Sequence, residues 1–500
     1  MARYKPYSYD QSLMMPVKLK DQLVPGSIEF AIHHLIDHKM DMSVLDERYV
    51  NDDNGRPAYD PKILLKVVLV AYARGIIGSR RIEQACRENM VFIALTCGQV
   101  PDHSTIATFV SSMKEEVGPL FRDILLVCEE MGLLDGTTFA LDGCKLPSNA
   151  SKEWSGTHET LRKKQRKLEE KVYELIDRQM EADKKPDPSN NSFSKQIERL
   201  EKKADRIRRF LDENAPRRGR TGKEIKSNVT DNESCFMKTS HGGIQGFNAQ
   251  ALVNEEQVIV AAGVFGSGQD YDHLEPMIEV AKQNLEAIGH SEEYFEGKTF
   301  LADSNYHCES NLEACEEEKL DAYIPDVNFR KRDERFDTQS RHKPKRDKFS
   351  VEDFIYDEDR DVFICPQGRD LTLRAKRAQA EDRVHRRYVI KGDDCTGCPF
   401  FSKCLEKKRG GKRKHLHVPI ETKESFHRQM MEKIDTDEGK RKYEKRLGMV
   451  EPVFANIRIH KQLDRFTLRG RIKVNIQWLL YCMVHNIEKL IRKGYGYGIC

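Results

Sequence analysis

The sequence predicts a mixed α/β protein with a helical N-terminal part. Apolar residues recur at helix-like spacing across residues 26–134. Short β-prone runs then begin at residue 137 and alternate with helical segments, as expected of a packed sheet. Residues 441–493 return to helical spacing. Helices are therefore expected on both sides of the strand-containing region in the sequence.

Composition indicates a large, ion-rich globular chain. The 500 residues exceed what one hydrophobic core usually organises, and 33% of them are charged. The most apolar runs, 63–73 and 478–484, are far shorter than the roughly 20 residues of a membrane span. Residues 1–20 lack the apolar stretch of a secretory signal, so we expect a cytoplasmic protein that contacts no membrane.

The N-terminal region is predicted to form a compact helical module. Asp60 and Pro61 make a typical helix start, with an N-cap carboxylate followed by proline at the first helical position. Further helices are expected over 80–88, 104–113 and 117–131. Helix-turn-helix DNA binding is one interpretation of such a module, and simple packing is the other.

The expected core has the order β, β, β, α, β, α, β. Its strands are predicted over 137–141, 246–253, 257–264, 298–302 and 322–325. The first main helix is predicted over 272–285, with Asp272 as its N-cap. The first and fourth strands end at Asp142 and Asp303, which places an acidic residue at the end of each.

Two long segments interrupt this core. Apolar residues repeat at heptad-like spacing over 161–175 and 197–211, with a polar run at 186–191 between them. This pattern predicts an antiparallel helical hairpin, for which a purely structural role is the simpler interpretation. Residues 328–439, in contrast, are predicted to be irregular and basic.

Asp142, Asp303 and Glu451 are the candidate catalytic residues. An ionised group at the end of a buried strand is costly unless it has a partner, and a hard divalent cation is one such partner. A turn or a helix cap is the alternative role for each aspartate. Glu451 stands among apolar neighbours and is predicted to face inward and join them. A salt bridge to Arg446 or Arg458 is its alternative role.

Six segments together carry a family resemblance. They are PDHSTIATF (101–109), LDGCKLPSNAS (141–151), GFNAQALV (246–253), ADSNYHCESNL (302–312), VEPVFANIR (450–458) and LRGRIKVNIQWLLYCMVHNIEKL (468–490). In this order the chain resembles bacterial DDE insertion-sequence transposases, in which the last catalytic Glu lies in a Tyr-Arg-Glu-Lys signature. The resemblance implies a ribonuclease-H-like catalytic core with inserted segments, preceded by an all-helical N-terminal domain.

The resemblance also implies roles for individual residues. Asp142, Asp303 and Glu451 take the places of the catalytic triad, which would hold two Mg²⁺ ions. Tyr443, Arg446 and Arg458 lie at or near the signature positions and would contact DNA. The sequence departs from the signature in two ways: Arg458 replaces the usual Lys, and four residues instead of three separate Arg446 from Glu451.

The domain organisation follows from the resemblance. A helical DNA-binding domain is expected over 1–132, a hairpin insertion over 152–222 and a basic insertion over 328–439. The catalytic core is assembled from the remaining stretches, 133–151, 223–327 and 440–493.

The implied activity is DNA transposition. The enzyme would nick transposon ends and join the freed 3′-hydroxyl to target DNA by two-metal phosphodiester chemistry. Its partners would be double-stranded DNA, as terminal inverted repeats and as target, and it would be a dimer on the DNA ends. A nuclease without joining activity and a non-catalytic DNA-binding protein from a decayed element are the alternatives.

Basic clusters fit a DNA partner. One contains Arg330, Lys331 and Arg332, and another contains Lys407, Lys408 and Arg409. Such clusters neutralise phosphates and make DNA binding salt-dependent, although a solvated surface is the common alternative.

Four cysteines form a last group of candidate ligands. Cys395 and Cys398 have the short spacing that lets two thiolates reach one Zn²⁺, and Cys365 and Cys404 could complete a four-cysteine site. Reduced structural thiols and redox-active thiols are the alternatives.

Overall fold

The chain divides into two units in the computed structural model. One comprises Met1–Tyr306, Ala314–Ala322 and Glu444–Cys500, and the other comprises His307–Glu313 and Tyr323–Tyr443. We call them the first and the second unit. The structure describes residues 18–48, 57–183, 193–219, 222–239, 242–336, 349, 351–380, 383–390, 395, 397–405, 413–419 and 426–497.

The N-terminal residues of the first unit are helical, as the sequence predicted. The helices are α1 (Ile28–His38), α2 (Pro61–Ala73), α3 (Ser79–Glu88), α4 (Met90–Leu95), α5 (His103–Ser112) and α6 (Val117–Glu130). Asp60 caps α2, because its side chain accepts a hydrogen bond from the Lys62 amide, and Pro61 occupies the first helical position. The residues of α2 are almost all buried, so this helix is the centre of the helical part.

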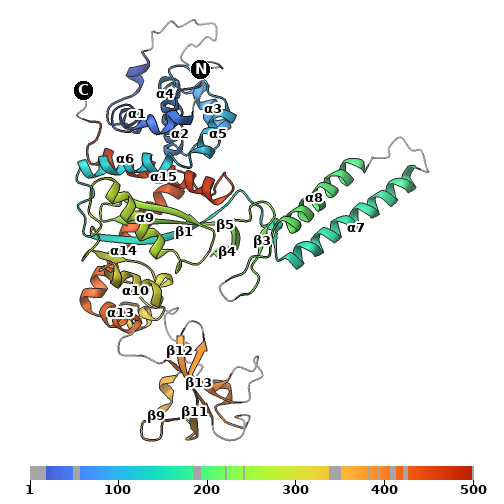
Figure 1. Cartoon of the computed structure of the whole chain (residues 1–500), viewed down its shortest axis with the longest axis vertical. Helices are drawn as coiled ribbons and strands as arrows, with labels where there is room; N and C mark the ends of the chain where they lie inside the picture. Colours follow the sequence, from blue (N-terminus) through green and yellow to red (C-terminus); the bar gives the residue numbers. More distant parts are fainter. Residues whose placement is uncertain are drawn as a thin grey trace, which may run out of the picture. The chain divides into compact units, whose positions relative to one another are not determined.

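A six-stranded sheet forms the core of the first unit. Its strands are β1 (Thr138–Pro147), β4 (Cys235–Thr239), β5 (Gly242–Asn254), β6 (Ile259–Phe265), β7 (Thr299–Leu301) and β8 (Asp321–Tyr323). The strand order is β4-β5-β1-β7-β8, and β6 pairs with β5 (Figure 1). β1 runs antiparallel to β5 and parallel to β7. The five predicted strands are present in the predicted order along the chain, and β4 is a further strand that the sequence analysis missed.

Two sequence predictions in this core are wrong in detail. β1 does not end at Asp142, because it continues to Pro147 by pairing with β5. The following helix, α9 (Leu274–Ala287), begins after the predicted position, and its N-cap is His273 instead of Asp272. The N-cap signal was misleading because the chain after β6 makes a further turn before the helix starts.

The C-terminal helix α15 (Arg471–Arg492) connects the helical part to the sheet. It packs against α2, α6 and β6 (Figure 1). The Tyr481 ring stacks on the Tyr72 ring of α2, with 4.4 Å between centroids. The Asn486 side chain exchanges two hydrogen bonds of 2.9 Å with the Ile259 backbone and so continues the pairing of β6. Buried amides of this kind fix the helix in one register on the sheet.

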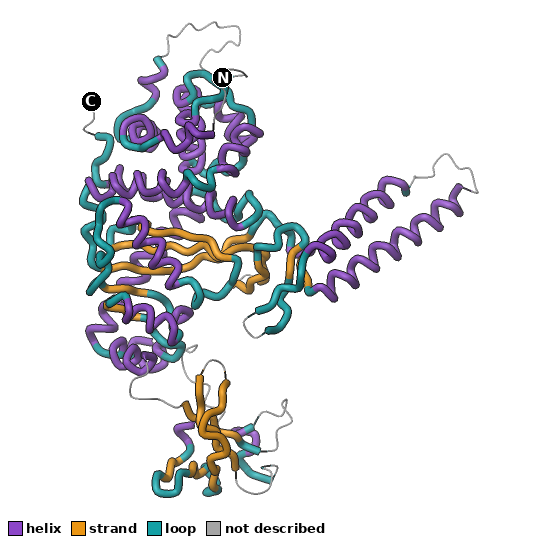
Figure 2. Tube along the Cα trace, viewed as in Figure 1, coloured by secondary structure: helices purple, strands orange, loops and turns teal. Residues whose placement is uncertain are grey.

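The predicted helical hairpin is present. α7 (His158–Asp183) and α8 (Ser194–Glu213) lie side by side as a long antiparallel pair (Figure 2). At their base, a small core of Leu161, Ile207, Phe210 and Val229 lies beside the short strand pair β2 (Ser155–Gly156) and β3 (Ser227–Asn228). The predicted polar run 186–191 lies outside the described residues.

The second unit contains a sheet that the sequence analysis missed. Its antiparallel strands, in the order β13-β12-β11-β10-β9, are β9 (Ile355–Asp357), β10 (Val362–Ile364), β11 (Asp370–Ala380), β12 (Arg383–Ile390) and β13 (His415–Pro419). The prediction of an irregular segment was wrong because strands this rich in charge show little apolar alternation. Phe363, Leu371 and Tyr388 belong to the core under this sheet.

Short helices complete the chain. They are α10 (Glu309–Glu317), α11 (Phe329–Arg332), α12 (Phe401–Cys404), α13 (Phe426–Ile434) and α14 (Asp437–Ala455), which continues into a π-helical turn at Asn456–His460. No helix among the described residues is both long enough and apolar enough to cross a membrane.

His485 on α15 predicts acid sensitivity. The side chain is 1% exposed, accepts a hydrogen bond from Asn456 at Nδ1 and donates one to the Gln257 carbonyl from Nε2, both at 2.9 Å. Burial lowers the pKa of His485 to about 3. His485 therefore takes up a proton near pH 6.5 in the unfolded chain but only near pH 3 in the folded chain. The free energy of unfolding falls as the pH drops from about 6.5 to about 3.

We expect His485 to lower the free energy of unfolding by about 2 kcal/mol at pH 5 relative to pH 7.5. Urea unfolding of the wild type and of His485→Gln at both pH values measures it. His460→Gln, which removes an exposed histidine, is the control. Equal pH dependence in the wild type and His485→Gln would contradict the assignment.

Candidate active site

Asp142 and Asp303 lie together in the first unit. The parallel pairing of β1 with β7 ends at Ala140 and Leu301, and each aspartate comes two residues after these partners. The negative charge of Asp142 is, after burial, the largest influence that raises the pKa of Asp303. The tertiary structure thus brings the two predicted carboxylates close enough for their charges to interact.

The electrostatics of this pair favour a cation. Burial raises the pKa of Asp142, and Arg446 opposes this by donating from Nη1 to Oδ2 at 2.9 Å. Burial raises the pKa of Asp303 to about 6, and the Asn305 amide opposes this with a hydrogen bond of 2.8 Å. The pKa of Asp303 stays high because burial and the negative charges of Asp142 and Asp270 outweigh the hydrogen bond from Asn305 and the charge of Arg446. A bound cation would offset these negative charges.

Asp270 is a third acid at this site, and the sequence analysis missed it. It lies in the loop between β6 and α9, and it is 7% exposed. It accepts hydrogen bonds from Asn248 Nδ2 at 2.6 Å and from Gln250 Nε2 at 2.9 Å. Its charge adds to the rise in the pKa of both Asp142 and Asp303. The signal in the sequence was the position of Asp270 after the third predicted strand, but Asp272, two residues later, fits a helix N-cap equally well.

Gly143 makes room for this polar cluster. A Cβ at position 143 would come within 2.7 Å of Asn248 Oδ1 and 2.9 Å of Asp270 Oδ1. Asn248 is fully buried, and its Oδ1 has no hydrogen-bond partner in the described part of the chain. The glycine directly after Asp142 is therefore required by close approach, not by its backbone angles.

Glu451 is not part of the cluster. It is exposed on α14, contrary to the predicted inward orientation, and no hydrogen bond or ion pair joins it to another described residue. The cause is helix geometry: Arg446 is 6% exposed and faces Asp142, and Glu451 follows five residues later, about 140° around the helix. The predicted alternative, a salt bridge from Glu451 to Arg446 or Arg458, is also wrong: Arg446 pairs with Asp142, and Glu451 forms no ion pair with Arg458 among the described residues.

Pro452 leaves one backbone carbonyl of α14 free to contact the sheet region. Pro452 lies inside this helix and has no N–H to offer the Gly448 carbonyl one turn earlier. The Gly448 oxygen instead accepts a hydrogen bond of 2.8 Å from Gln257 Nε2, beside the start of β6. The helix segment that carries Arg446 and Glu451 is thereby tied to the sheet.

Arg458 and Tyr443 occupy different surroundings. Arg458 is exposed on the π-helical turn after α14, and it opposes the rise that burial causes in the pKa of the Cys144 thiol on β1. Arg458 therefore lies near the site, because Cys144 is only two residues along β1 from Asp142. Tyr443 belongs to the second unit, where its ring packs edge-on against Phe329.

The first basic cluster is engaged in local contacts of the second unit. Arg332 pairs with Asp326 at 2.6 Å and with Asp435 at 2.7 Å. Lys331 donates to the Asn328 side chain, and the Arg330 guanidinium lies over the Phe336 ring. The predicted DNA-binding residues Lys407, Lys408 and Arg409 lie outside the described residues.

The four candidate zinc ligands gather in the second unit. Cys395 is buried in its core, and Cys365, Cys398 and Cys404 pack against the same core. Burial raises the pKa of Cys404, and the other three thiols add to this effect. Within the described ranges, however, no three His, Cys, Asp or Glu side chains are grouped so that they could hold a metal ion.

Gly143→Ala should destabilise the first unit by about 1–3 kcal/mol, because the added methyl group overlaps the polar cluster. Urea unfolding measures the change. Gly448→Ala is the matched control: it meets open space inside α14 and should stabilise by about 0.5–1 kcal/mol. Equal effects of the two substitutions would exclude the proposed crowding.

Two stretches of the chain match family models. Residues 364–491 match the family described as "Transposase DDE domain", and residues 17–112 match "Transposase domain (DUF772)". The first stretch contains Arg446, Glu451 and Arg458. The comparison with curated proteins found no match, and neither did the comparison with solved structures. Both stretches are therefore similar to transposase domains, which supports a transposase function for this chain.

Proposed function

We propose that this protein is a DNA transposase of the DDE type, with its catalytic centre at Asp142 and Asp303. The observation that carries the proposal is the juxtaposition of these two half-buried carboxylates, one on β1 and the other just after its parallel neighbour β7. The strand path β6-β5-β1-β7-β8, antiparallel across its first two pairs and parallel between β1 and β7, is the arrangement expected of a ribonuclease-H-like core.

The residues present suit a hard divalent cation. Carboxylate oxygens are the ligands that Mg²⁺ prefers, and the raised pKa of Asp303 marks a place where a cation is favoured. Asp142 and Asp303 would hold Mg²⁺, and Glu451 is the third proposed ligand. Two bound ions would supply charge neutralisation and an activated nucleophile for phosphodiester chemistry. Glu451 can join the pair only if α14 turns or shifts, because its side chain is exposed.

The remaining residues position and balance the pair. Arg446 neutralises Asp142 directly, and its planar fork of donors also suits a phosphate group near the scissile bond. Asn248 and Gln250 hold the Asp270 carboxylate, and the Tyr306 hydroxyl donates to Gln250 Oε1. This hydrogen-bonded floor keeps the backbone at Gly143, and with it Asp142, in one position.

The proposed reaction has two steps. The enzyme nicks the transposon ends and then joins the freed 3′-hydroxyl to target DNA. Terminal inverted repeats and target DNA are the proposed partners, and the enzyme would act as a dimer on paired ends. A nuclease without joining activity and a non-catalytic DNA-binding protein remain the competing functions. Pre-nicked end DNA separates them, because only a transposase joins its 3′-hydroxyl to a second duplex.

Asp142→Asn, Asp303→Asn and Glu451→Gln should each lower Mg²⁺-dependent cleavage of transposon-end DNA by about 10³-fold or more, because each removes a proposed ligand charge. Gel assays of cleavage and binding measure the outcome, and binding should persist. Asp272→Asn removes an exposed carboxylate close to Asp270 and should leave cleavage unchanged. Wild-type cleavage rates in Asp142→Asn or Asp303→Asn would refute the catalytic centre, whereas wild-type rates in Glu451→Gln alone would remove only the third ligand.

We also propose that Cys365, Cys395, Cys398 and Cys404 bind one structural Zn²⁺. The support is that all four pack on one core and that none is in a disulfide. The Arg369 amide also lies 3.4 Å from the Cys365 sulfur and donates a hydrogen bond to it.

Metal analysis of the purified protein should find about one Zn²⁺ per chain, as for a closed four-cysteine site. Cys395→Ser and Cys398→Ser should lose it, whereas Cys97→Ser, at an exposed cysteine of the first unit, should retain it. A zinc content near zero in the wild type would rule out the site.

A further inference from the structure

The turn directly after α14 contains one residue more than a regular helix can hold. The helix continues into the π-helical turn at Asn456–His460, where the Lys461 amide donates to the Asn456 carbonyl at 3.0 Å, five residues back instead of the four of an α-helix. Residues on the two sides of this turn are therefore offset from each other by one position. Single π-helical turns of this kind are frequent at functional sites.

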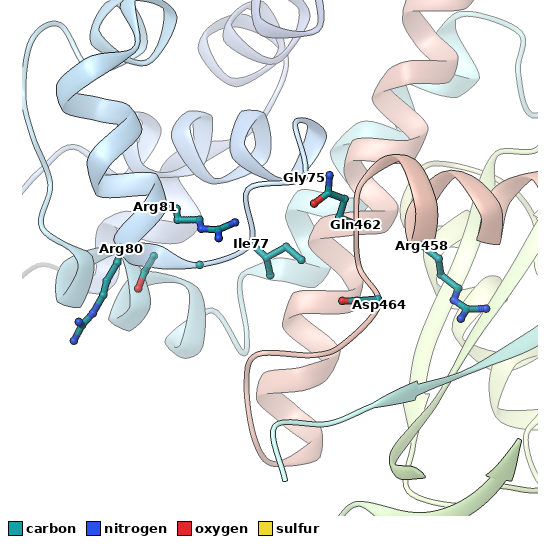
Figure 3. Close-up of a pocket in the computed structure, with 9 residues that line it drawn as sticks. Gly75, Ile77, Arg80, Arg81, Arg458, Gln462 and Asp464 are labelled. Atoms are coloured by element: carbon teal, nitrogen blue, oxygen red, sulfur yellow. The ribbon is translucent and has the colours of Figure 1, made fainter. Parts of the chain in front are cut away.

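The chain after the π-helical turn is held by its surroundings. Lys461 is fully buried, and its Nζ donates to Glu488 Oε2 of α15 at 2.6 Å. The next residue, Gln462, lies beside Gly75, where a Cβ would come within 3.1 Å of the Gln462 side chain. Arg458, inside the turn, points away from that side (Figure 3). The C-terminal end of the turn is thus fixed both by an ion pair and by packing.

The helix is also held before the turn, at Arg446 and Gly448. Arg446 Nη1 donates to Asp142 Oδ2 at 2.9 Å, and the Gly448 carbonyl accepts from Gln257 Nε2 at 2.8 Å. These polar contacts enclose residues 449–455, whose buried side chains are all apolar. Apolar packing is non-directional, so this stretch is the part of the helix that can shift by one position.

The stretch around Gly448 is suited to take up the extra residue. Pro452 has no N–H for the Gly448 carbonyl, so a π-type bond from the next amide, that of Val453, would break no α-helical bond of this carbonyl. Apart from proline, glycine also has the lowest helix propensity. A wider turn therefore costs less here than elsewhere in α14.

An extra residue before Glu451 would change the direction of its side chain. Each of residues 451–455 would move into the place of its predecessor, so Glu451 would take the place of Val450. Val450 is fully buried and lies four residues after Arg446, about 40° around the helix from it. Because Arg446 faces Asp142, Glu451 would then face the same carboxylate.

The same shift would exchange apolar side chains next to Glu451. Phe454 would take the place of Val453, which is fully buried, and Val453 would take the exposed place of Pro452. The buried place would therefore keep an apolar side chain. The Phe454 ring now stacks parallel to the Trp478 ring of α15, with 6.2 Å between centroids, so the shift would also change the surroundings of this indole.

We infer that the extra residue of the π-helical turn moves to the stretch around Gly448 when Glu451 joins Asp142 and Asp303. The inference rests on the proposed function and adds how Glu451 reaches the other two carboxylates. With the extra residue after α14, Glu451 is exposed; with the extra residue around Gly448, it faces the pair. Lys461 is a positioning residue, because it fixes the end against which the helix shifts.

Deletion of Ile459 tests the inference. Ile459 lies in the π-helical turn and is 71% exposed. Without it, Asn456 and Lys461 have the four-residue spacing of an α-helix, so no extra residue remains to move. The urea midpoint should stay unchanged or rise, whereas Mg²⁺-dependent cleavage of transposon-end DNA should fall by about 10³-fold, as in Glu451→Gln. Combining the deletion with Glu451→Gln should cause no further loss.

Trp478 fluorescence gives a readout that does not depend on cleavage. The chain has two tryptophans, so Trp154→Phe leaves Trp478 as the reporter. Adding Mg²⁺ to the full chain without DNA should change the Trp478 emission in this background. The change should be absent when Ile459 is deleted and when Glu451→Gln is introduced.

Gly448→Ala decides the matter if the deletion variant does not fold. Alanine favours a regular helix where the extra residue has to go, so cleavage should slow about threefold to fivefold although the protein is more stable. Gly118→Ala is the matched control in α6, where the added Cβ meets only the Arg122 side chain at 3.6 Å, and it should leave the cleavage rate unchanged.

Three results would overturn the inference and leave Asp142 and Asp303 as the proposed centre. They are wild-type cleavage by the deletion variant, an unchanged rate in Gly448→Ala, and Trp478 emission that does not respond to Mg²⁺ in a protein that cleaves. A wild type that cleaves no transposon-end DNA would instead contradict the proposed function.

Discussion

The repulsion between two half-buried carboxylates is the constraint on which the rest of the site depends. Asp142 and Asp303 lie close enough for their charges to interact because β1 and β7 are parallel neighbours, and burial raises the pKa of both. A fold can tolerate such a pair only with compensating donors or cations. Arg446 supplies one charge, and the Gly143 and Asn305 amides supply hydrogen bonds.

The surrounding structure adds further negative charge to this pair instead of neutralising it. Asp270 adds a third acid, held by the side chains of Asn248 and Gln250 against the backbone at Gly143. A protein optimised for stability alone would gain from replacing these groups by apolar ones. The presence of these three acids together is the basis of the proposed metal-binding centre, and the two stretches similar to transposase domains lie on either side of them in the sequence.

Packing of α15 explains how distant segments meet at one site. This helix contacts α2 and α6 as well as β6, and its Trp478 donates to the Gln250 carbonyl at 2.9 Å. α14, tied to the sheet through the Gly448 carbonyl, brings Arg446 to Asp142 from more than 300 positions away in the sequence. The N-terminal helices and the candidate active site consequently belong to one packed unit.

Local patterns determined much of this protein. Helix caps such as Asp60, the alternation of strands and helices, and the placement of Asp142 and Asp303 after apolar runs follow from short-range chemistry, and the structure has them. The direction in which a side chain points did not follow from these local patterns. Spacing alone allowed Glu451 to face inward, but packing turned Arg446 inward and left Glu451 exposed, since one helix face cannot present both. The approach of Asp270 to Asp142 and Asp303 was likewise decided by the tertiary structure, because only folding brings residues so far apart in the chain within reach of one another.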